Sequence, residues 1–536
     1  MDDETLVEWH EWGPAPFEEA RAADRPVLLS LTAPWCHWCA RMDEEAYSNP
    51  SVAANIHDDF VPVRVDIDRH PRVRERYQMG GFPSTVVLTP SGDIVSGATY
   101  MTTENLRTVL ERVREVWDER GEDAGRVPRA LRDPEPPRGH LDGEVEGHML
   151  EQVRSAFDEE YGGWGVDAKF PLPRTVEFAL KRDRDRALRT LEAVHTHLYD
   201  TYGGGFYRYA TGRDWSDPHR EKLLDENAAV ARAFANAYLY TGETTYRDAA
   251  LGTRDYLTTT LWSGDAFAGS QAGGDYYTLE ASEREAADPP HVDGTVFADR
   301  NGLAVDALLR LHAYTDDEAA GRYARRALDH VRETLVDDGA VAHYARSEGE
   351  RGLLADQARV LGALVTAGQV LDPDYFEAAR SVADWTVDRR LDDGTFTDGP
   401  QTGPALLSRP LRPLETTVEL ADALVDLSLA TGEERYRTVA EDALSAFAGA
   451  RHRMGVEVAG YATAASRVVR DPLVVRVADA PGSDLHRAAW RVADHEKVVV
   501  PGADGEPGTA RVVVDGEAAD PVETPAELDR RVRQSS

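Results

Sequence analysis

The sequence predicts a multidomain protein: an N-terminal α/β domain, a long all-α domain and a small α/β C-terminal region. A chain of 536 residues is longer than one hydrophobic core usually organises. Short apolar strands alternate with helical patterns at the start of the chain, whereas helix-period segments recur in pairs further on. We therefore expect domains at 1–118, 145–452 and 453–536, with a charged Pro/Gly linker at 119–144.

The composition is strongly acidic, with 96 acidic against 60 basic residues and a net charge of −36. Only four of the basic residues are lysine. The acid is spread along the chain, which is typical of a solvated shell at very high salt, a halophilic, haloarchaeal-type composition. A surface that binds a partner is the alternative interpretation. No basic stripe stands out, so the sequence predicts no nucleic-acid partner.

The apolar runs, such as Val27 to Leu31, are far too short to cross a bilayer, so no membrane association is expected. Residues 1–4 are acidic where a secretory signal would be basic. The sequence contains two cysteines, too few for a disulfide scaffold. These features predict a soluble, cytoplasmic protein.

The first domain has the pattern of βα units followed by a hairpin. A continuous apolar strand at 27–32 is expected in a buried parallel position. The turn Pro90–Asp93 separates the two strands of the hairpin. We predict helices at 14–24, 37–47, 50–59 and 103–117, and strands at 27–32, 60–66, 84–89 and 94–96.

The two cysteines, Cys36 and Cys39, directly follow the first strand and precede a helical pattern. This spacing is typical of a thiol/disulfide redox centre. Cys36 would lie just before the first helical turn, where unpaired N–H groups, the helix dipole and a protonated His37 stabilise a thiolate. Cys39 is then placed as the resolving thiol. Trp35 and Trp38 flank the pair and would supply an apolar docking surface.

Two other interpretations of the cysteine pair are a metal site and an inert dithiol. A zinc site needs four ligands, and no second CxxC or His-x-His lies nearby. Covalent haem attachment needs histidine at position 40, which is Ala40. The sequence therefore predicts catalytic Cys36 and Cys39, with no cofactor and no metal.

The order of strand, W-C-x-x-C, helix, strand and Phe-Pro turn resembles thioredoxin. Cys36-His37-Trp38-Cys39, with Gly80–Pro83 and Leu88–Pro90 downstream, is similar more narrowly to the spermatogenesis-associated protein 20-like thioredoxin family. The resemblance implies a thioredoxin-like domain before a helical barrel, and a cis Pro83 opposite the thiols. Ser30 stands where thioredoxins carry a buried aspartate, which weakens the expected acid–base support for Cys39.

The all-α domain is predicted from paired helical segments joined by Gly-aromatic turns such as Tyr202–Tyr207. Such pairs resemble the (α/α)6 toroid of six-hairpin glycosidases and sugar epimerases. Five pairs are clear in the sequence, and the sixth is not. A small α/β appendage is expected after the toroid. The predicted helices span 145–157, 174–200, 223–241, 244–261, 299–314, 317–335, 353–371, 374–391, 413–430 and 433–449.

Candidate residues for a cavity in the toroid follow its turns. Two of the four lysines, Lys169 and Lys222, lie in motifs that match the family. Lysine in an arginine-rich chain indicates that a compact ammonium is needed, either in a site or in a buried ion pair with Glu221, Asp225 or Glu226. The complete set of candidates is Lys169, His219, Glu221, Lys222, Asp225, Glu226, Asp299, Asn301, Asp356 and Glu415.

Three functions fit these features. The leading hypothesis is a thiol–disulfide oxidoreductase-like protein whose toroid binds a ligand or a protein client. The second is a carbohydrate-active enzyme, either a sugar epimerase in which His219 moves a proton or a glycoside hydrolase with paired carboxylates. The third is a non-catalytic scaffold. The expected partner is a protein thiol/disulfide client or a small carbohydrate-like ligand.

Overall fold

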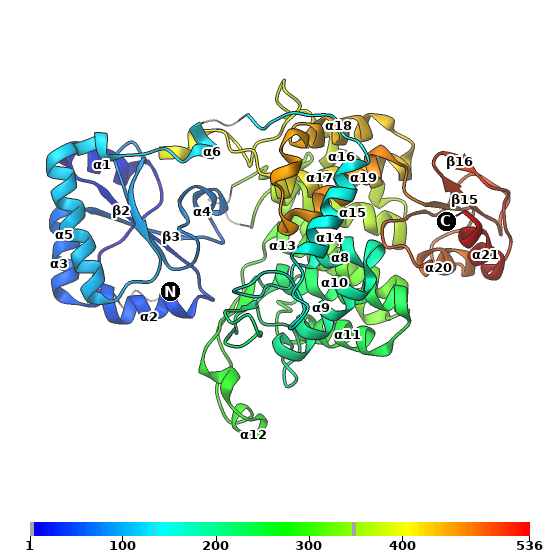
Figure 1. The fold of residues 1–536 in the computed structure, drawn as a ribbon, viewed down its shortest axis with the longest axis horizontal. Coiled ribbons are helices and arrows are strands. Elements are labelled where there is room, and N and C mark those ends of the chain that lie inside the picture. The colour runs from blue at the N-terminus through cyan, green and yellow to red at the C-terminus, as the bar shows by residue number, and fades with distance from the viewer. Residues whose placement is uncertain (1–4, 133–134, 346–349, 536) are drawn as a thin grey trace. The chain divides into compact units, whose positions relative to one another are not determined.

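A computed structural model describes residues 5–132, 135–345 and 350–535 of the chain. The chain divides into two compact units, which we call the N-terminal unit and the helical unit. The acidic start at 1–4 and residues 133–134 of the expected linker lie outside the described residues. Each unit is described separately below, with the element labels of Figure 1.

The N-terminal unit is built on a five-stranded mixed sheet. The strand order is β1-β3-β2-β4-β5, with β2 parallel to β3 and antiparallel to β4. Every residue of the central strand β2 is buried, as its continuous apolar run predicts. The strands are β1 (His10–Glu11), β2 (Val27–Thr32), β3 (Val61–Asp66), β4 (Ser84–Leu88) and β5 (Ile94–Ala98).

Local sequence signals define the helices of this unit. The Asn49 side chain accepts hydrogen bonds from the amides of Ser51 and Val52, and Pro50 occupies the first turn of α3. Helices α3 and α5 lie side by side against the sheet (Figure 1). The predicted α/β domain is confirmed. Its helices are α1 (Pro14–Ala23), α2 (His37–Met42), α3 (Pro50–Asp59), α4 (Pro71–Tyr77) and α5 (Thr103–Arg120).

Two segments from the later chain complete the N-terminal unit, Ala272–Asp293 and Thr397–Arg412. Arg76 of α4, whose side chain is fully buried, binds Asp398 at 2.5 Å and the carbonyl of Leu406 at 2.9 Å. The sequence boundary at residue 118 does not include these segments, because pairing across more than 300 residues leaves no local signal.

The expected linker at 119–144 is divided between the two units. Arg126 forms a β-bridge with Ile94, and the buried Leu131 belongs to α6 (Arg129–Arg132) in the N-terminal unit. Further on, the amide of Gly139 donates to the carbonyl of Ser445 in the helical unit. Charge and proline content predicted an extended segment. In the structure, a few apolar and backbone contacts attach most of its described residues to one unit or the other.

The helical unit contains a closed ring of inner helices that pack side by side, each backed by an outer helix. The ring closes where α19 packs against α8, and the outer helix α7 packs against α19. The sixth pair therefore joins the first and last helices of the toroid, which is why consecutive pairing did not show it. The predicted (α/α)6 toroid is confirmed. The inner helices are α8 (Pro173–Arg182), α10 (Leu224–Thr241), α13 (Ala298–Thr315), α15 (Leu354–Val370), α17 (Leu414–Thr431) and α19 (Ala459–Val469).

An outer helix precedes each inner helix along the chain. One predicted helix, 174–200, is broken at Asp183 into the pair α8 and α9. Gly242, with φ of 70°, ends α10 in the left-handed conformation that favours glycine. The outer helices are α7 (Glu144–Ser155), α9 (Arg184–Leu198), α11 (Thr244–Thr259), α14 (Glu318–Leu335), α16 (Tyr375–Val387) and α18 (Glu434–Ser445).

Buried amide side chains hold the Gly-aromatic turns of successive hairpins. Asn227 accepts from the amide of Phe206 and donates to its carbonyl, and Asn301 does the same with Phe267. Gln357 takes this role in the next hairpin through the amide of Val341. These side chains occupy the fourth position of α10, α13 and α15, so Asn301 is engaged with backbone.

The C-terminal appendage is a four-stranded sheet with two helices, in the strand order β14-β13-β15-β16. It packs against the end of α15, where Gln369 accepts hydrogen bonds from His486, Trp490 and Val499. The Gln369 carbonyl accepts from the His486 ring at 2.8 Å, and its side chain accepts from the Val499 amide at 2.9 Å. The appendage comprises β13 (Val474–Val477), α20 (Asp484–Trp490), β14 (Val498–Val500), β15 (Ala510–Val514), β16 (Glu517–Ala518) and α21 (Pro525–Ser535).

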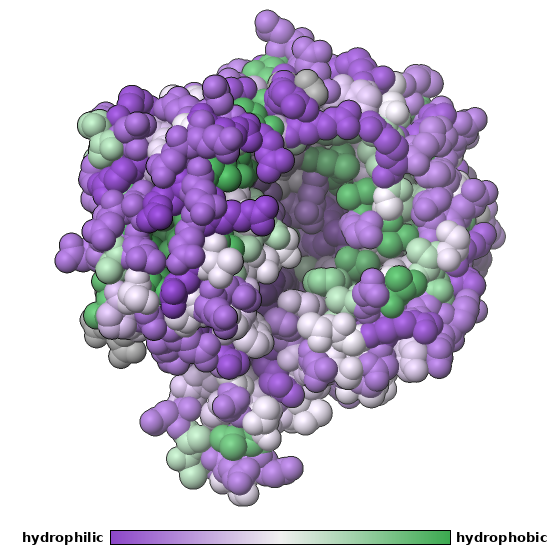
Figure 2. All heavy atoms as spheres, turned by 60° about the vertical axis from the view of Figure 1, so that its left-hand side comes forward, coloured by the Kyte–Doolittle hydropathy of each residue, from purple (hydrophilic) through white to green (hydrophobic). Residues whose placement is uncertain are grey.

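Hydrophilic residues dominate the outer surface of the face drawn in Figure 2, as the acidic composition leads one to expect. Within the described residues, no helix combines the length and apolar character that crossing a membrane requires.

Candidate functional site

A cavity of about 110 Å³ runs into the centre of the helical unit. All six inner helices contribute to its wall, and residues 495–497 of the appendage line it as well. Its wall is dominated by charged side chains, which is unusual for a buried ligand site because such sites are mostly apolar.

The charged groups of the wall are paired with one another. Arg232 binds Glu177 at 2.7 Å and Asp306 at 2.8 Å, and Arg359 binds Glu419 at 2.8 Å. Arg310 and Arg232 hold the pKa of the Asp306 carboxyl far below its usual range, although burial opposes them. The cavity therefore has a wall of fixed, mutually compensating charges.

Lys497 differs from the other three lysines of the chain, because no salt bridge joins it to a carboxylate among the described residues. Its ammonium donates to the carbonyl of Asp494 at 3.0 Å and lies over the rings of Tyr314 and Trp490. Burial lowers the pKa of Lys497 from 10.5 to about 7. The folded protein thus disfavours the charged form of this side chain.

We expect Lys497→Met to stabilise the protein, and to do so more at pH 6 than at pH 9. The unfolded amine stays protonated up to about pH 10.5, whereas the folded amine loses its proton near pH 7. The cost of folding the wild-type amine therefore grows as the pH falls from 10.5 to 7 and stays maximal below that. Thermal unfolding of both proteins at the two pH values measures the difference, and an equal gain at both would contradict the lowered pKa.

The inner helices all begin at the same end of the ring, because each is preceded by an outer helix that runs in the opposite direction. We call this end the mouth. Acidic residues occupy the first turns there, as the positive helix N-termini favour: Asp225, Glu226, Asp299, Asp356 and Glu415.

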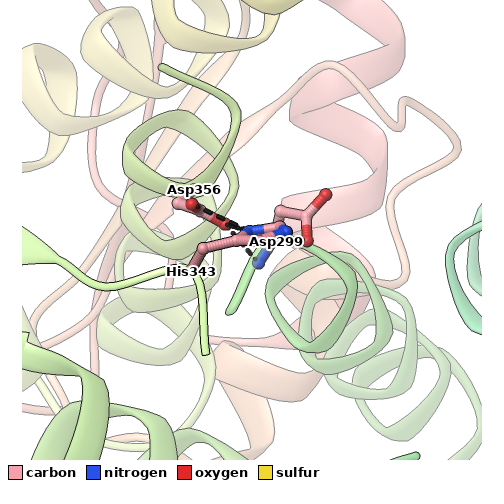
Figure 3. A group of neighbouring side chains, drawn as sticks. All are labelled: Asp299, His343 and Asp356. Atoms are coloured by element: carbon pink, nitrogen blue, oxygen red, sulfur yellow. Dashed lines mark hydrogen bonds and ion pairs between the residues drawn. The ribbon is translucent and has the colours of Figure 1, made fainter. Parts of the chain in front are cut away.

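Three side chains converge at the mouth, Asp299 from α13, Asp356 from α15, and His343 from the loop between β12 (Ala340–Val341) and α15 (Figure 3). His343 Nδ1 lies 2.9 Å from Asp356 Oδ1 and 4.0 Å from Asp299 Oδ1. Burial raises the pKa of Asp356, whereas His343 and Arg359 together lower the pKa of Asp299 against the effect of burial. Sequence reasoning named the two aspartates and missed His343, which follows the turn in a loop without any motif.

A second group of predicted residues consists of His219, Glu221 and Glu226. His219 Nδ1 lies 3.8 Å from Glu221 Oε2, and its ring stacks on Tyr209 at 4.2 Å. Arg208 binds Glu226 at 3.2 Å, and burial raises the pKa of the Glu226 carboxyl. Elsewhere at the mouth, Asp225 lies 3.9 Å from Arg300, and Glu415 is exposed.

Lys169 and Lys222 occupy equivalent positions under two Gly-rich turns. Lys169 binds Asp158 at 2.8 Å and the carbonyl of Gly165. Lys222 binds Asp200 at 2.7 Å and the carbonyl of Gly204. Both ammonium groups are buried in ion pairs, and Lys222 binds Asp200, a carboxylate that is not among the three partners expected from the sequence. A compact cation that also binds a carbonyl explains why lysine is used at both places.

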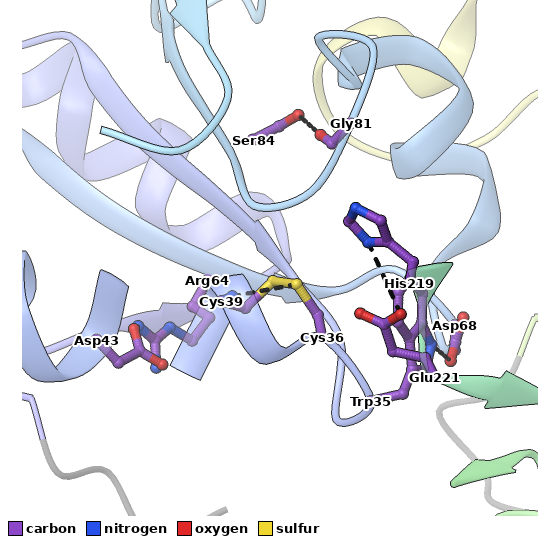
Figure 4. The surroundings of a disulfide bond; sticks show 10 residues. All are labelled: Trp35, Cys36, Cys39, Asp43, Arg64, Asp68, Gly81, Ser84, His219 and Glu221. Carbon is purple, nitrogen blue, oxygen red and sulfur yellow. Dashed lines mark hydrogen bonds and ion pairs between the residues drawn. A yellow bond between two sulfur atoms is a disulfide. The ribbon is translucent and has the colours of Figure 1, made fainter. Parts of the chain in front are cut away.

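The dithiol lies where β2 leads into α2 (Figure 4). Cys36 is the N-cap of α2, and its Sγ accepts a hydrogen bond from the amide of Cys39 at 3.1 Å. The two sulfur atoms are joined as a disulfide. The same amide that caps the helix would stabilise a Cys36 thiolate once the disulfide is reduced.

Aromatic and acidic groups surround the dithiol within the N-terminal unit. The Trp35 indole donates a hydrogen bond to Asp68 at 2.8 Å (Figure 4). The same ring packs edge-on against Phe82, and the Phe82–Pro83 peptide bond is cis. Trp38 packs on Tyr100, while the His37 side chain is exposed. The predicted support residues thus lie around the cysteine pair or in the loop before β4.

A titratable carboxyl group that sequence reasoning missed ends strand β3. Asp66 lies in register with Thr32, the last residue of β2, and binds Arg69 at 2.9 Å. Burial and the neighbouring Asp68 raise the pKa of Asp66 to about 6. Ser30 is buried in β2, and the carboxyl groups of Asp66 and Asp68 come from the end of β3 and from the turn that follows it.

The fold and the dithiol define a protein with a thioredoxin-like domain joined to a helical toroid. Residues 2–133 match the family Thioredox_DsbH, described as a protein of unknown function, DUF255. The chain is 32% identical over 324 residues to human spermatogenesis-associated protein 20, covering 53% of this chain and 39% of the human protein. These matches confirm the predicted resemblance to the spermatogenesis-associated protein 20-like thioredoxin family, and the chain spans about two-fifths of the length of the curated human relative.

Further similarities cover single domains. The Pseudomonas aeruginosa thiol:disulfide interchange protein DsbD 1 is 31% identical over 104 residues, which is 19% of this chain and 17% of that protein. A sugar epimerase from a ruminal bacterium has a TM-score of 0.47 and 13% identity, covering 56% of this chain and 84% of that structure. A D-mannose isomerase has a TM-score of 0.45 and 13% identity, covering 61% and 97% of the two chains.

Proposed function

We propose that the protein catalyses thiol–disulfide exchange with a protein client through Cys36 and Cys39, and that the helical unit binds a ligand or client. The observation that carries this proposal is the Cys36–Cys39 pair itself. The only two cysteines of the chain form a disulfide at a helix start, and the Cys39 amide points at Cys36 Sγ.

In the reduced protein, the Cys36 thiolate attacks one sulfur of a client disulfide and releases the other as a thiolate. The resulting mixed disulfide is resolved when Cys39, after losing its proton, attacks Cys36 Sγ. The client leaves as a dithiol, and the Cys36–Cys39 disulfide is formed. The reverse sequence oxidises a client dithiol.

The neighbouring groups suit these steps. The helix-capping amide stabilises negative charge on Cys36, so this thiol is the expected nucleophile. Trp35 is buried and fixed by its bond to Asp68, so it orients the segment that leads into Cys36 and does not form the exposed docking surface expected from the sequence.

We expect reduced Cys39→Ser to form a stable mixed disulfide with oxidised glutathione, because the resolving thiol is missing. Cys36→Ser is the matched control and should capture far less, since its remaining Cys39 lies within α2, whereas Cys36 is the N-cap residue whose Sγ accepts the Cys39 amide. Intact-mass measurement after mixing gives the fraction captured by each variant. Equal capture by both variants, or capture by neither, would contradict the assigned roles.

Carbohydrate chemistry in the helical unit stays a prediction. His219 and Glu221 are the pair that it would use, and Glu221 Oε2 is buried without a hydrogen-bond partner among the described residues. A thiol–disulfide function does not require this pair.

A further inference from the structure

We propose that Asp299, His343 and Asp356 bind a divalent first-row transition ion, Zn²⁺ or Mn²⁺, at the mouth of the helical unit. One ligand atom from each side chain lies within 4.8 Å of the other two. The sequence predicted no metal site, because the three residues are separated by 57 positions and follow no ligand motif.

The geometry suits a single ion. Ligands about 2.1 Å from a tetrahedral ion are separated by about 3.4 Å. His343 Nδ1 lies 2.9 and 3.1 Å from the two Asp356 oxygens and 4.0 Å from Asp299 Oδ1, which brackets that separation. Small side-chain rotations would equalise these distances, with the ion replacing any proton on Nδ1.

Asp299 Oδ1 is the observation that calls for a further partner. This oxygen is buried and accepts no hydrogen bond from any described residue, although it lies beside His343 and Asp356 (Figure 3). Leaving a buried carboxylate oxygen without a partner costs free energy, which a bound cation would recover.

The net charge of the surrounding side chains favours a bound cation. Arg359 contacts Asp299 through Oδ2, the oxygen that faces away from the cluster, and its charge is shared with Glu419. With a neutral imidazole, Asp299, Asp356 and Glu419 against Arg359 leave a net charge of two negative units. A divalent ion compensates this charge.

The supporting contacts fix the ligands as metal sites require. Arg359 orients Asp299 at 2.9 Å, and the Asp299 amide donates to Asp356 at 3.1 Å. Two carboxylates and an imidazole suit Zn²⁺ and Mn²⁺ and not soft ions such as Cu(I). Three protein ligands leave a coordination position open, as in zinc sites that bind an exchangeable oxygen ligand.

The test is calorimetric titration of the EDTA-treated, dialysed full-length protein with ZnCl₂ and, separately, MnCl₂. We expect one equivalent to bind, and affinity to fall at least about 100-fold in Asp356→Asn and His343→Gln. Asp225→Asn is the matched control. It removes charge from another mouth carboxylate whose buried Oδ1 accepts no hydrogen bond from the described residues, but it lies outside the cluster and should keep wild-type affinity.

Asp299→Asn keeps the test decisive if the fully buried Asp356 cannot be replaced without unfolding. Its side chain is partly exposed, and the substitution preserves its size. The visible spectrum of the Co²⁺-loaded protein reports the ligands directly and should change in Asp299→Asn but not in Asp225→Asn. The proposal is overturned if wild type takes up no stoichiometric ion, or if Asp225→Asn and Asp299→Asn lose affinity equally.

Discussion

Replacing Arg232 with leucine should lower the free energy of unfolding by about 3–5 kcal/mol, because it breaks a buried ion network. The guanidinium binds Glu177 through two nitrogen atoms and Asp306 through a third, inside the cavity of the helical unit. Asp306 keeps its ion pair with Arg310, but Glu177 would retain the hydrogen bond from the Asn236 side-chain amide without a salt bridge among the described residues. An uncompensated carboxylate in this wall is the source of the loss.

Urea unfolding at constant salt measures this effect, and Arg326→Leu provides the control. Arg326 pairs with Asp265 at 2.8 Å, but both side chains are more than half exposed. Exposed pairs contribute about 0–1 kcal/mol, so the control should be nearly neutral. A similar loss in the free energy of unfolding of both variants would show that burial does not increase the contribution of the Arg232 network to stability.

Replacing Arg76 with leucine should release the segment Thr397–Arg412 from the N-terminal unit. The buried guanidinium binds Asp398 and the carbonyls of Leu406 and Arg409. Removing it leaves these acceptors without their charged donor, at a cost of about 1–3 kcal/mol for each buried acceptor that finds no water. We expect cleavage within this segment by a low dose of protease to accelerate at least about 10-fold.

Arg74→Leu is the control for this experiment. Arg74 lies in the same helix α4 but forms its ion pair with the adjacent, exposed Glu75. Its loss should leave the cleavage rate of 397–412 unchanged. Equal acceleration in both variants would show that α4 itself, and not the Arg76 contacts, had been disturbed.

The local parts of this structure could be predicted from the sequence. The run Val27–Thr32 indicated a buried strand, and the 3.6-residue periodicity located ten helical segments of the toroid. Both patterns could be recognised because each depends on residues that are close together in the sequence. The pairing of α7 with α19 could not be predicted, since it joins segments about 300 residues apart.

The candidate sites divide in the same way. Cys36 and Cys39 are recognised by their spacing and their place before a helix. His343 is not, because its importance arises only when the ring brings α13 and α15 together. Lys222 shows the opposite case: a rare residue drew attention, and its ion pair with Asp200 explains it structurally.

The closure of the ring by its first and last helices has a consequence for biosynthesis. A ribosome synthesises α7 early, but the partner α19 ends only at Val469. The nascent toroid must therefore wait, with one inner position open, until the ribosome has passed Val469. The N-terminal unit also waits, because its last segment ends at Arg412. Neither unit can therefore be completed before its last segment, Thr397–Arg412 or α19, has been translated.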